Sequence, residues 1–532
     1  MTRPYPAVVC VGLDGATFDV IDPMVAAGRL PTLAKLLSGG TRAALRSVIP
    51  PLSAPAWVSF MTGTNPGRHG VYHFRTLERD GIGATLVGSW AYKGTTIFDR
   101  ASAAGRRVLA FRVPMTYPAW PVNGTMISGF PTPDPRTTYS EPPGVGARIG
   151  PLVQMNAMRS MVSSVADQAA NFDFYLERST DAIVELLAAG DVDFFCYVNS
   201  VTDWIAHKFW RFSDPDAPAY EPYAVAGGGT LIESFYEKVD DSLGRILAAA
   251  PDDALVVVLS DHGTGRRSTA RFDTAAWLEG LGLFARAGGG RGPRGSGRRR
   301  LVAVLDWVKD VVPKKHWLWR HAPALVRTRV ASVRSEKAAV DWSRARAYPV
   351  KLDHHVEGVN VNRELVGDRY EEVRDAVIAA AAFVPQLIGV HRREDVYSGS
   401  HADVAPDVIL ELDPAFEFGP GTSAPASRMK RSSATHRQDG ILALAGPGVR
   451  EGVDLGHASL LDVPATLMWA LGLDVPAAMD GRVLSDAFDP DFVAAHPARI
   501  GDAGVDSEGP AAVYTADEEA GMAAHLEELG YL

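Results

Sequence analysis

The sequence is poor in several features that would narrow its function at once. Only 2 of its 532 residues are cysteine, which excludes a disulfide-rich secreted scaffold. These two residues, Cys10 and Cys196, stand in apolar, strand-like runs, so we expect buried thiols and no disulfide. No apolar run is long enough to cross a membrane, and the N-terminus lacks the apolar segment of a signal peptide. We therefore expect a soluble, cytoplasmic protein.

Basic residues are outnumbered by acidic ones. The chain has 53 Lys and Arg against 63 Asp and Glu, a formal net charge of −10, which argues against a nucleic-acid polymer as partner. The content of 46% hydrophobic and 22% charged residues is ordinary for a globular protein with a sizeable core. The length allows one large α/β domain with an insertion, or two or three domains.

Short apolar runs alternate with amphipathic stretches through the first half of the chain. Buried strands are predicted at residues 7–13, 108–113, 125–129, 194–198 and 254–260. Helices are predicted at residues 22–37, 95–104, 171–189 and 231–249. This alternation predicts an α/β fold with a doubly wound, mostly parallel sheet and helices on both of its faces.

The alternation stops after residue 265. We expect a first core part at 1–265, an inserted α+β cap at 266–430, a second core part at 431–490 and a tail at 491–532 with a terminal helix at 515–529. The cap includes a basic, glycine-rich loop at 288–300. The stretch that follows, to residue 330, mixes Trp with Lys and Arg. It is either a lid helix packed on the core or a surface for anionic lipid headgroups.

Residues 50–74 read as a loop, a short apolar helix and a glycine-containing turn. Pro55 suits the first position of a helix, where a backbone N–H is not needed. Ser53 then lies just before the helix start, where free N–H groups and the helix dipole favour an anion. A serine beside an anion site is a candidate nucleophile, although most serines in this position only cap the helix.

Side chains of metal-binding types lie at the ends of predicted strands or in adjoining turns: Asp14, Asp203, His207, Asp261, His262 and His436. Asp203 and His207 are four residues apart and so share one side of a helical turn. The carboxyl ends of the strands in a doubly wound sheet share one crevice. Three carboxylates and three imidazoles suffice for two divalent cations, with Zn²⁺ favoured by the histidines and Mn²⁺ as the alternative.

Several segments resemble motifs of the alkaline phosphatase superfamily and occur in the order found in that family. The resemblance is strongest to its type I phosphodiesterase/nucleotide pyrophosphatase branch. The segments are VVCVGLDG, PPLSAPAWVSFMTGTNPGRHGV, SVTDWIAH, VVVLSDHG, THRQDG and DVPATLMWALGLDVPAAMDGRVL. Residues 270–430 resemble the variable cap of that family. The resemblance implies that one metal is held by Asp203, His207 and His436. It implies that the second is held by Asp14, Asp261 and His262 and also touches Ser53.

The resemblance also implies the reaction. Two cations roughly 3.5–4 Å apart clamp the attacking and leaving oxygens of an in-line displacement at phosphorus. A metal-bound Ser53 attacks as an alkoxide, and water later hydrolyses the phosphoseryl intermediate. We expect the N–H of Ala54 to bind a non-bridging oxygen. The expected substrate is a small phosphate ester whose leaving group the sequence does not identify.

The chain departs from the family pattern at two places. Nucleotide pyrophosphatases usually have a threonine nucleophile and a phosphoryl-contacting Asn, and here Phe74 stands where the Asn is expected. His73 or Arg68 is a candidate replacement, with a structural role equally open for each. We interpret the neighbouring His354 and His355 of the insertion as surface residues, and substrate contact as the alternative.

Other functions remain open on the same core. The segment SAPAWVSFMTG is similar to the sulfatase motif, but Trp57 occupies the place of the Arg that formylglycine maturation requires. The histidines also suit two transition metals better than the single Ca²⁺ of sulfatases. A phosphomonoesterase, a phosphoglycerate mutase-like enzyme or a phosphonate hydrolase shares the same ligand set. The non-enzyme alternative is a membrane-surface scaffold that uses the basic insertion.

Overall fold

The computed structural model describes residues 3–79, 81–133, 139–149, 164–286, 340–421, 423 and 433–501, with 514–515, 518–519, 521–523 and 526 near the C-terminus. The predicted basic loop and the suggested lipid-contact stretch, 288–330, lie outside these residues, so lipid contact stays a prediction. Most of the predicted terminal helix also lies outside them. None of the helices in the described part of the chain combines the length and apolarity needed to cross a membrane.

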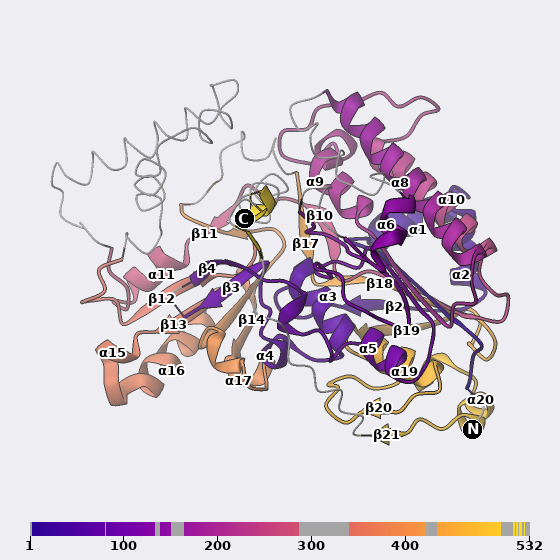
Figure 1. Ribbon diagram of the computed structural model, residues 1–532. Coiled ribbons are helices and arrows are strands. Elements are labelled where there is room, and N and C mark those ends of the chain that lie inside the picture. The colour runs from indigo at the N-terminus through magenta and orange to yellow at the C-terminus, as the bar shows by residue number, and fades with distance from the viewer. Residues whose placement is uncertain are drawn as a thin grey trace.

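A nine-stranded sheet forms the centre of the larger part of the molecule (Figure 1). Its strand order is β19-β2-β18-β9-β1-β8-β5-β6-β7. The bounds are β1 (Val8–Leu13), β2 (Thr41–Arg46), β5 (Val108–Phe111), β6 (Gly124–Ile127), β7 (Ser140–Glu141), β8 (Phe194–Asn199), β9 (Leu255–Leu259), β18 (Asp439–Ala445) and β19 (Val453–Ser459). Strand β18 is antiparallel to both of its neighbours and β7 is antiparallel to β6, whereas the other pairs are parallel.

Helices cover both faces of this sheet (Figure 1). One layer contains α1 (Phe18–Ala26), α2 (Pro31–Ser38), α8 (Val165–Ala188), α9 (Val201–Ser213) and α10 (Leu231–Ala248). The other contains α3 (Ser53–Thr62), α5 (Ile97–Ala103) and α19 (Asp462–Ala470). The shorter helices are α4 (Pro66–His69), α6 (Pro143–Ile149), α11 (Thr274–Gly280) and α20 (Pro490–Ala495). The predicted α/β fold with a mostly parallel sheet is confirmed.

Two local expectations differ from the structure. The helix predicted at 22–37 is two helices, because Gly28 takes a left-handed conformation (φ 72°) and Pro31 begins the second helix. Strand β2 was not predicted, because its sequence TRAALR alternates buried and partly exposed positions and so lacks an apolar run. The strand nevertheless lies inside the sheet, between β19 and β18. Cys10 and Cys196 are buried free thiols, as predicted, and they lie opposite each other on β1 and β8.

A second, antiparallel sheet has its own hydrophobic cluster. Its strands, in spatial order, are β12 (Ala347–Lys351), β13 (Val356–Val361), β15 (Val408–Leu412) and β14 (Leu387–Arg392). Helices α15 (Arg363–Val366), α16 (Tyr370–Ala381) and α17 (Arg393–Val396) accompany it (Figure 1). We call residues 340–421 the inserted subdomain.

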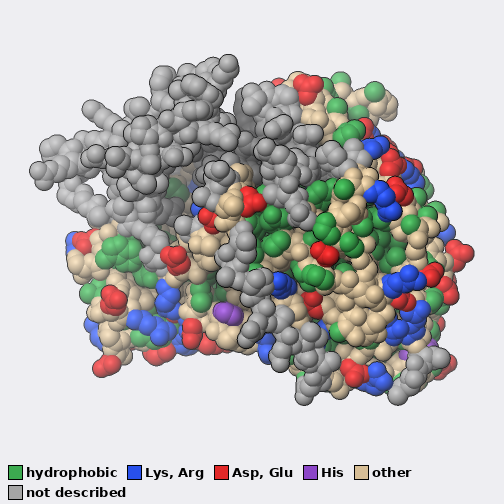
Figure 2. Space-filling model, in the orientation of Figure 1, with side chains coloured by type: hydrophobic (Ala, Val, Ile, Leu, Met, Phe, Trp, Pro, Cys, Tyr) green, Lys and Arg blue, Asp and Glu red, His purple; other side chains and the backbone are tan. Residues whose placement is uncertain are grey.

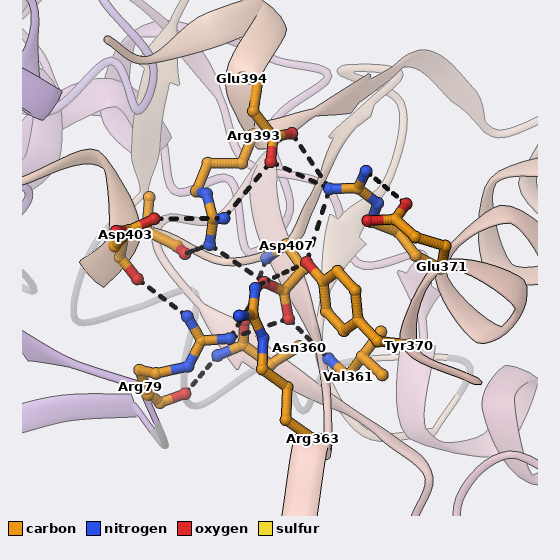
Figure 3. A network of polar contacts seen from close by, with 12 residues as sticks. Arg79, Asn360, Val361, Arg363, Tyr370, Glu371, Arg393, Glu394, Asp403 and Asp407 are labelled. Atoms are coloured by element: carbon orange, nitrogen blue, oxygen red, sulfur yellow. Dashed lines mark hydrogen bonds and ion pairs between the residues drawn. The ribbon is translucent and has the colours of Figure 1, made fainter. Parts of the chain in front are cut away.

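A hairpin from the first part of the chain packs against the inserted subdomain. It consists of β3 (Arg75–Glu78) and β4 (Gly81–Leu86), and β4 contacts β12. The buried carboxylate of Asp407, in the inserted subdomain, binds Arg79 of this hairpin (Figure 3). It accepts hydrogen bonds from Arg79 at 3.0 Å, from Arg393 at 3.0 Å and from the Tyr370 hydroxyl at 2.9 Å. It also accepts the backbone N–H of Val361 at 2.9 Å, so one carboxylate joins segments from three parts of the chain.

Charged side chains of both signs are interspersed over the described surface in the orientation of Figure 2. Lys and Arg lie beside Asp and Glu on the inserted subdomain and on the helical layer of the main sheet. The described residues of this face therefore show no large area in which charge of only one sign gathers.

We predict that Asp407→Ala lowers the free energy of unfolding by about 3–5 kcal/mol, because a buried ion pair loses one partner. Denaturant unfolding of the whole chain measures this change. Asp375→Ala is the control, since Asp375 pairs with Arg392 at the surface and its side chain is 55% exposed. The control should lose no more than about 1 kcal/mol. Equal, small losses in both variants would contradict the role of Asp407.

Candidate metal centre

The carboxyl ends of three adjacent strands hold most of the candidate ligands. Asp14 directly follows β1, and Asp261 and His262 lie between β9 and β10 (Gly263–Arg266). Helix α9 begins just after β8 and carries Asp203 and His207. Because β1 pairs in parallel with both β8 and β9, these ends meet at one edge of the sheet.

His436 comes from a later part of the chain. It lies on β17 (Ala434–Arg437), which pairs antiparallel with β10 so that His436 is opposite Thr264. This short ladder brings it to the turn that carries His262, and the two imidazole rings lie 4.2 Å apart between centroids. All six predicted ligands are buried, each with at most 3% of its surface exposed.

Ser53 is the first residue of α3, and Leu52 is the N-cap. The prediction placed Ser53 just outside the helix, with Pro55 at the first helical position, and this was wrong by two residues. Pro55 is the third helical residue, where the missing N–H still falls within the unbonded first turn. The N-cap residue Leu52 makes no side-chain hydrogen bond to this start, and the first N–H groups of a helix, here those of Ser53 and Ala54, can bind an anion.

One group of ligands surrounds Asp203. The Nε2 atom of His207 lies 3.2 Å from Asp203 Oδ1 and 3.2 Å from His436 Nε2. The same His436 nitrogen lies 3.9 Å from Asp203 Oδ1. One donor atom each from Asp203, His262 and His436 lies within 4.8 Å of the other two, which is a spacing that a metal ion can occupy.

A second group adjoins the first through His262. One donor atom each from Asp14, Asp261 and His262 lies within 4.8 Å of the others. His262 Nε2 is 3.7 Å from Asp14 Oδ1 and 3.4 Å from Asp261 Oδ2. Ser53 Oγ lies 3.2 Å from His262 Nε2 and 3.4 Å from Asp14 Oδ1. The structure thus brings all six predicted ligands and the candidate nucleophile into one buried cluster.

Neighbouring groups fix the orientation of these side chains. The carbonyl of Gly263 lies 3.0 Å from His262 Nδ1 and accepts its proton, which leaves the Nε2 lone pair toward the cluster. The buried indole of Trp57 donates to Asp14 Oδ2 at 3.1 Å. A Cβ on Gly12 would approach the Trp57 ring to 2.4 Å, so β1 needs glycine there. From the sequence Trp57 is only a departure from the sulfatase motif, and this contact was not predicted.

The turn after β1 is held equally firmly. Gly15 has a left-handed φ of 67°, and a Cβ there would come within 2.7 Å of Thr264 Oγ1. Its N–H donates to Asp261 Oδ1 at 3.3 Å. The hydroxyls of Thr202 and Thr264 donate at 2.6 Å to the carbonyls of Asp14 and Gly15. These bonds position the Asp14 backbone relative to α9 and β10.

The cluster concentrates negative charge where water is excluded. Burial, with the nearby Asp261 and Asp203, raises the pKa of Asp14 well above its usual value. Burial and Asp203 raise the pKa of Asp261 to about 8. Burial also acts to raise the pKa of Asp203, but the imidazoles of His207 and His436 outweigh it and hold that pKa below its usual range. Such a set of carboxylates is stabilised by added positive charge.

Two of the substrate-contact candidates, Arg68 and His73, have contacts with groups outside the cluster. Arg68 forms an ion pair with Asp480 at 3.1 Å. His73 is buried, and its Nδ1 accepts the backbone N–H of Arg75 at 3.3 Å. The ring of Phe74, at the place of the expected Asn, is fully buried and turned into the core. Phosphoryl contacts by Arg68, His73 and the Ala54 N–H stay predictions.

The inserted subdomain contributes a residue that the sequence analysis missed. Asp353 lies between β12 and β13, is 6% exposed, and has Oδ1 3.7 Å from His436 Nδ1. The interpretation of its neighbours as surface histidines was wrong, because His355 is 7% exposed and the His354 side chain 15%. Three consecutive residues of metal-binding types, Asp-His-His, were the available signal.

Comparisons with known proteins bear on this site. Residues 8–440 match the family described as type I phosphodiesterase / nucleotide pyrophosphatase. No curated protein sequence shows significant similarity to the chain. Among solved structures, an inactive variant of murine ectonucleotide pyrophosphatase / phosphodiesterase 5 in complex with AMP is 14% identical, with a TM-score of 0.48. The murine and human proteins without that change align at 14% and 13% identity, each with a TM-score of 0.47. Each comparison covers 91% of this chain and 100% of the other.

The family match extends from β1 to the start of β18 and so includes every candidate ligand and Ser53. It confirms the resemblance that the sequence motifs predicted. It also supports the expected reaction class, a hydrolase of the phosphodiesterase and nucleotide pyrophosphatase type. The chain belongs to the type I phosphodiesterase / nucleotide pyrophosphatase family.

Proposed function

We propose that the protein is a metal-dependent phosphodiesterase in which Ser53 forms a phosphoseryl intermediate. The position of the Ser53 hydroxyl carries this proposal. Its oxygen lies 3.2 Å from His262 Nε2 and 3.4 Å from Asp14 Oδ1, beside the buried cluster. The Ser53 side chain does not cap α3, so its hydroxyl faces the cluster without a structural task in the helix. A serine in this setting suits nucleophilic attack.

The residues present fit two divalent cations. Three buried carboxylates lie together, and the Oδ2 atom of Asp261 accepts no hydrogen bond from any described residue. Oxygen and imidazole donors in this proportion suit Zn²⁺, with Mn²⁺ as the alternative. We propose that one cation is held by Asp203, His207 and His436, and the other by Asp14, Asp261 and His262. When bound, the cations supply Lewis-acid stabilisation of phosphoryl oxygens and lower the pKa of the serine hydroxyl.

The reaction then follows from the placement of the chain's own groups. Ser53 gives up its hydroxyl proton and its Oγ attacks phosphorus. The bond from phosphorus to the leaving oxygen breaks, and this oxygen takes up a proton as the leaving group departs as an alcohol or phosphate. The N–H groups of Ser53 and Ala54 at the start of α3 donate to a non-bridging oxygen. Water then hydrolyses the phosphoseryl ester and regenerates the serine. The substrate is a small phosphate diester, such as a nucleotide derivative.

We predict that Ser53→Ala lowers kcat for bis(p-nitrophenyl) phosphate by about 10³-fold or more, because the attacking oxygen is lost. Ser59→Ala is the matched control: Ser59 is a buried serine on the same helix, and its hydroxyl contacts His69 at 2.9 Å and not a proposed ligand. The control should retain activity. Diester turnover that survives Ser53→Ala would contradict the nucleophile. Faster cleavage of the p-nitrophenyl monoester by the unaltered protein would favour the phosphomonoesterase alternative.

We predict that removal of metal makes stability fall as pH rises. Folding raises the pKa of Asp261 to about 8, compared with about 3.9 in an unfolded chain. A carboxyl group of this kind stabilises the fold while it is protonated, and this contribution is lost as the pH rises toward 8. The lowered pKa of His262 has the opposite effect, but only below about pH 6.5.

The measurement is the melting temperature of chelator-treated and zinc-loaded protein between about pH 7 and pH 8.5. The metal-free protein should melt at a lower temperature as the pH rises through this window. The zinc-loaded protein should not, because bound cations keep the carboxylates ionised throughout. The same pH dependence with and without zinc would show that these carboxylates do not hold it.

A further inference from the structure

One hairpin of the inserted subdomain reaches the metal centre. Strands β12 and β13 are joined by residues 352–355, which include Asp353. Backbone bonds fix this connection to neighbouring segments. The carbonyl of His354 accepts the N–H of Phe418 at 2.9 Å, and that of His355 accepts the N–H of Leu412 at 2.9 Å. The side chain of Asp353 is thus presented by a well-anchored turn.

Asp353 and the ligand cluster lie on opposite sides of one imidazole ring. The Nδ1 atom of His436 is 3.7 Å from Asp353 Oδ1. The Nε2 atom of the same ring is 3.2 Å from His207 Nε2 and 3.9 Å from Asp203 Oδ1. His436 therefore directs Nε2 into the cluster and Nδ1 toward a carboxylate that belongs to the inserted subdomain.

This arrangement matches what a histidine ligand requires. A histidine that binds a cation through Nε2 carries its proton on Nδ1, and this N–H needs an acceptor. A carboxylate in that place fixes the tautomer and the ring orientation and makes the ligand more basic. His262 has a carbonyl of the core, that of Gly263, beside its Nδ1. For His436 the group beside Nδ1 is a carboxylate of the inserted subdomain, with Asp353 Oδ1 at 3.7 Å.

A second contact holds the hairpin against β17. His355 is buried, and its Nε2 accepts a hydrogen bond from Arg437 Nη1 at 2.8 Å. Arg437 also donates to the carbonyl of Arg266 at 2.6 Å, so it ties the hairpin to β10 as well. Two consecutive residues of β17 therefore meet two residues of the same turn. The contact of Asp353 with His436 is one of these two contacts between the β12–β13 hairpin and the two-stranded β10–β17 sheet.

We propose that Asp353 is a positioning residue for the metal ligand His436, through which the inserted subdomain completes the metal centre. This inference rests on the proposed two-metal function. Asp353 accepts the Nδ1 proton of His436 and holds the ring with Nε2 toward Asp203 and His207. The ligand set of one cation therefore depends on a segment outside the main sheet, whereas that of the other depends on the core alone.

The first test is the zinc affinity of metal-free, full-length protein, measured by competition with a chromophoric chelator. Asp353→Asn should weaken one of the two sites by about 10- to 100-fold and leave the other unchanged. The control Asp375→Asn removes an exposed carboxylate of the same subdomain and should change neither site. Unchanged affinity in Asp353→Asn would overturn the positioning role. Equal weakening of both sites would overturn it too, because the effect would then be a general one.

A second measurement does not depend on the folding of any variant at position 353. In the unaltered, zinc-loaded protein with ¹⁵N-labelled histidine, NMR should show a protected Nδ1–H proton on a ring whose Nε2 binds metal, and this signal should be absent in His436→Gln. A metal-bound Nδ1 on His436 would overturn the proposal. Neither test uses turnover, so a protein that binds zinc as described but cleaves no diester would contradict the proposed function and not this inference.

Discussion

The mutual repulsion of three buried carboxylates is the constraint around which this structure is arranged. Asp14, Asp203 and Asp261 each expose at most 2% of their surface and lie within one cluster. Loss of hydration and like-charge repulsion both oppose their ionisation. A fold gathers such groups only where a compensating charge is present, and the adjacent imidazoles and the proposed cations provide it. Without metal, the same burial and repulsion raise the pKa values of Asp14 and Asp261.

The rigidity that holds these groups comes from ordinary packing. Strands β1, β8 and β9 are central, parallel neighbours, and their carboxyl ends meet at one edge. On one side Trp57 packs into the space left by Gly12 and donates to Asp14. On the other side Thr202 and Thr264 hold the turn after β1. The side chains that repel one another are thus attached to elements that cannot readily separate.

Much of this could be predicted from the sequence, for a physical reason. Buried central strands such as 254–260 are apolar on both faces and can be recognised in the sequence. Candidate ligands directly after such strands can then be predicted to lie together, because the carboxyl ends of parallel strands meet at one edge of the sheet. Strand β2 has polar residues in alternation and was missed, although it lies inside the same sheet. The start of α3 was misplaced because proline is tolerated throughout the first turn and does not mark its first residue.

The contact between Asp353 and His436 lay beyond such reasoning. It joins the turn between β12 and β13 to the short strand β17, and no periodic pattern in the sequence relates these two segments. Only the packing of the inserted subdomain brings the two residues together. The main sheet and the strand ends that carry most of the predicted ligands follow from local rules, whereas the contact of Asp353 with His436 depends on the packing of the inserted subdomain.

The central claim is that this cluster binds two cations with the Ser53 hydroxyl directed at one of them. Anomalous diffraction at the zinc edge, from crystals of zinc-loaded protein, tests it most directly. Two peaks roughly 3.5–4 Å apart are predicted, with Ser53 Oγ beside the one that contacts Asp14. A single peak, or two peaks out of reach of Ser53, would contradict the account.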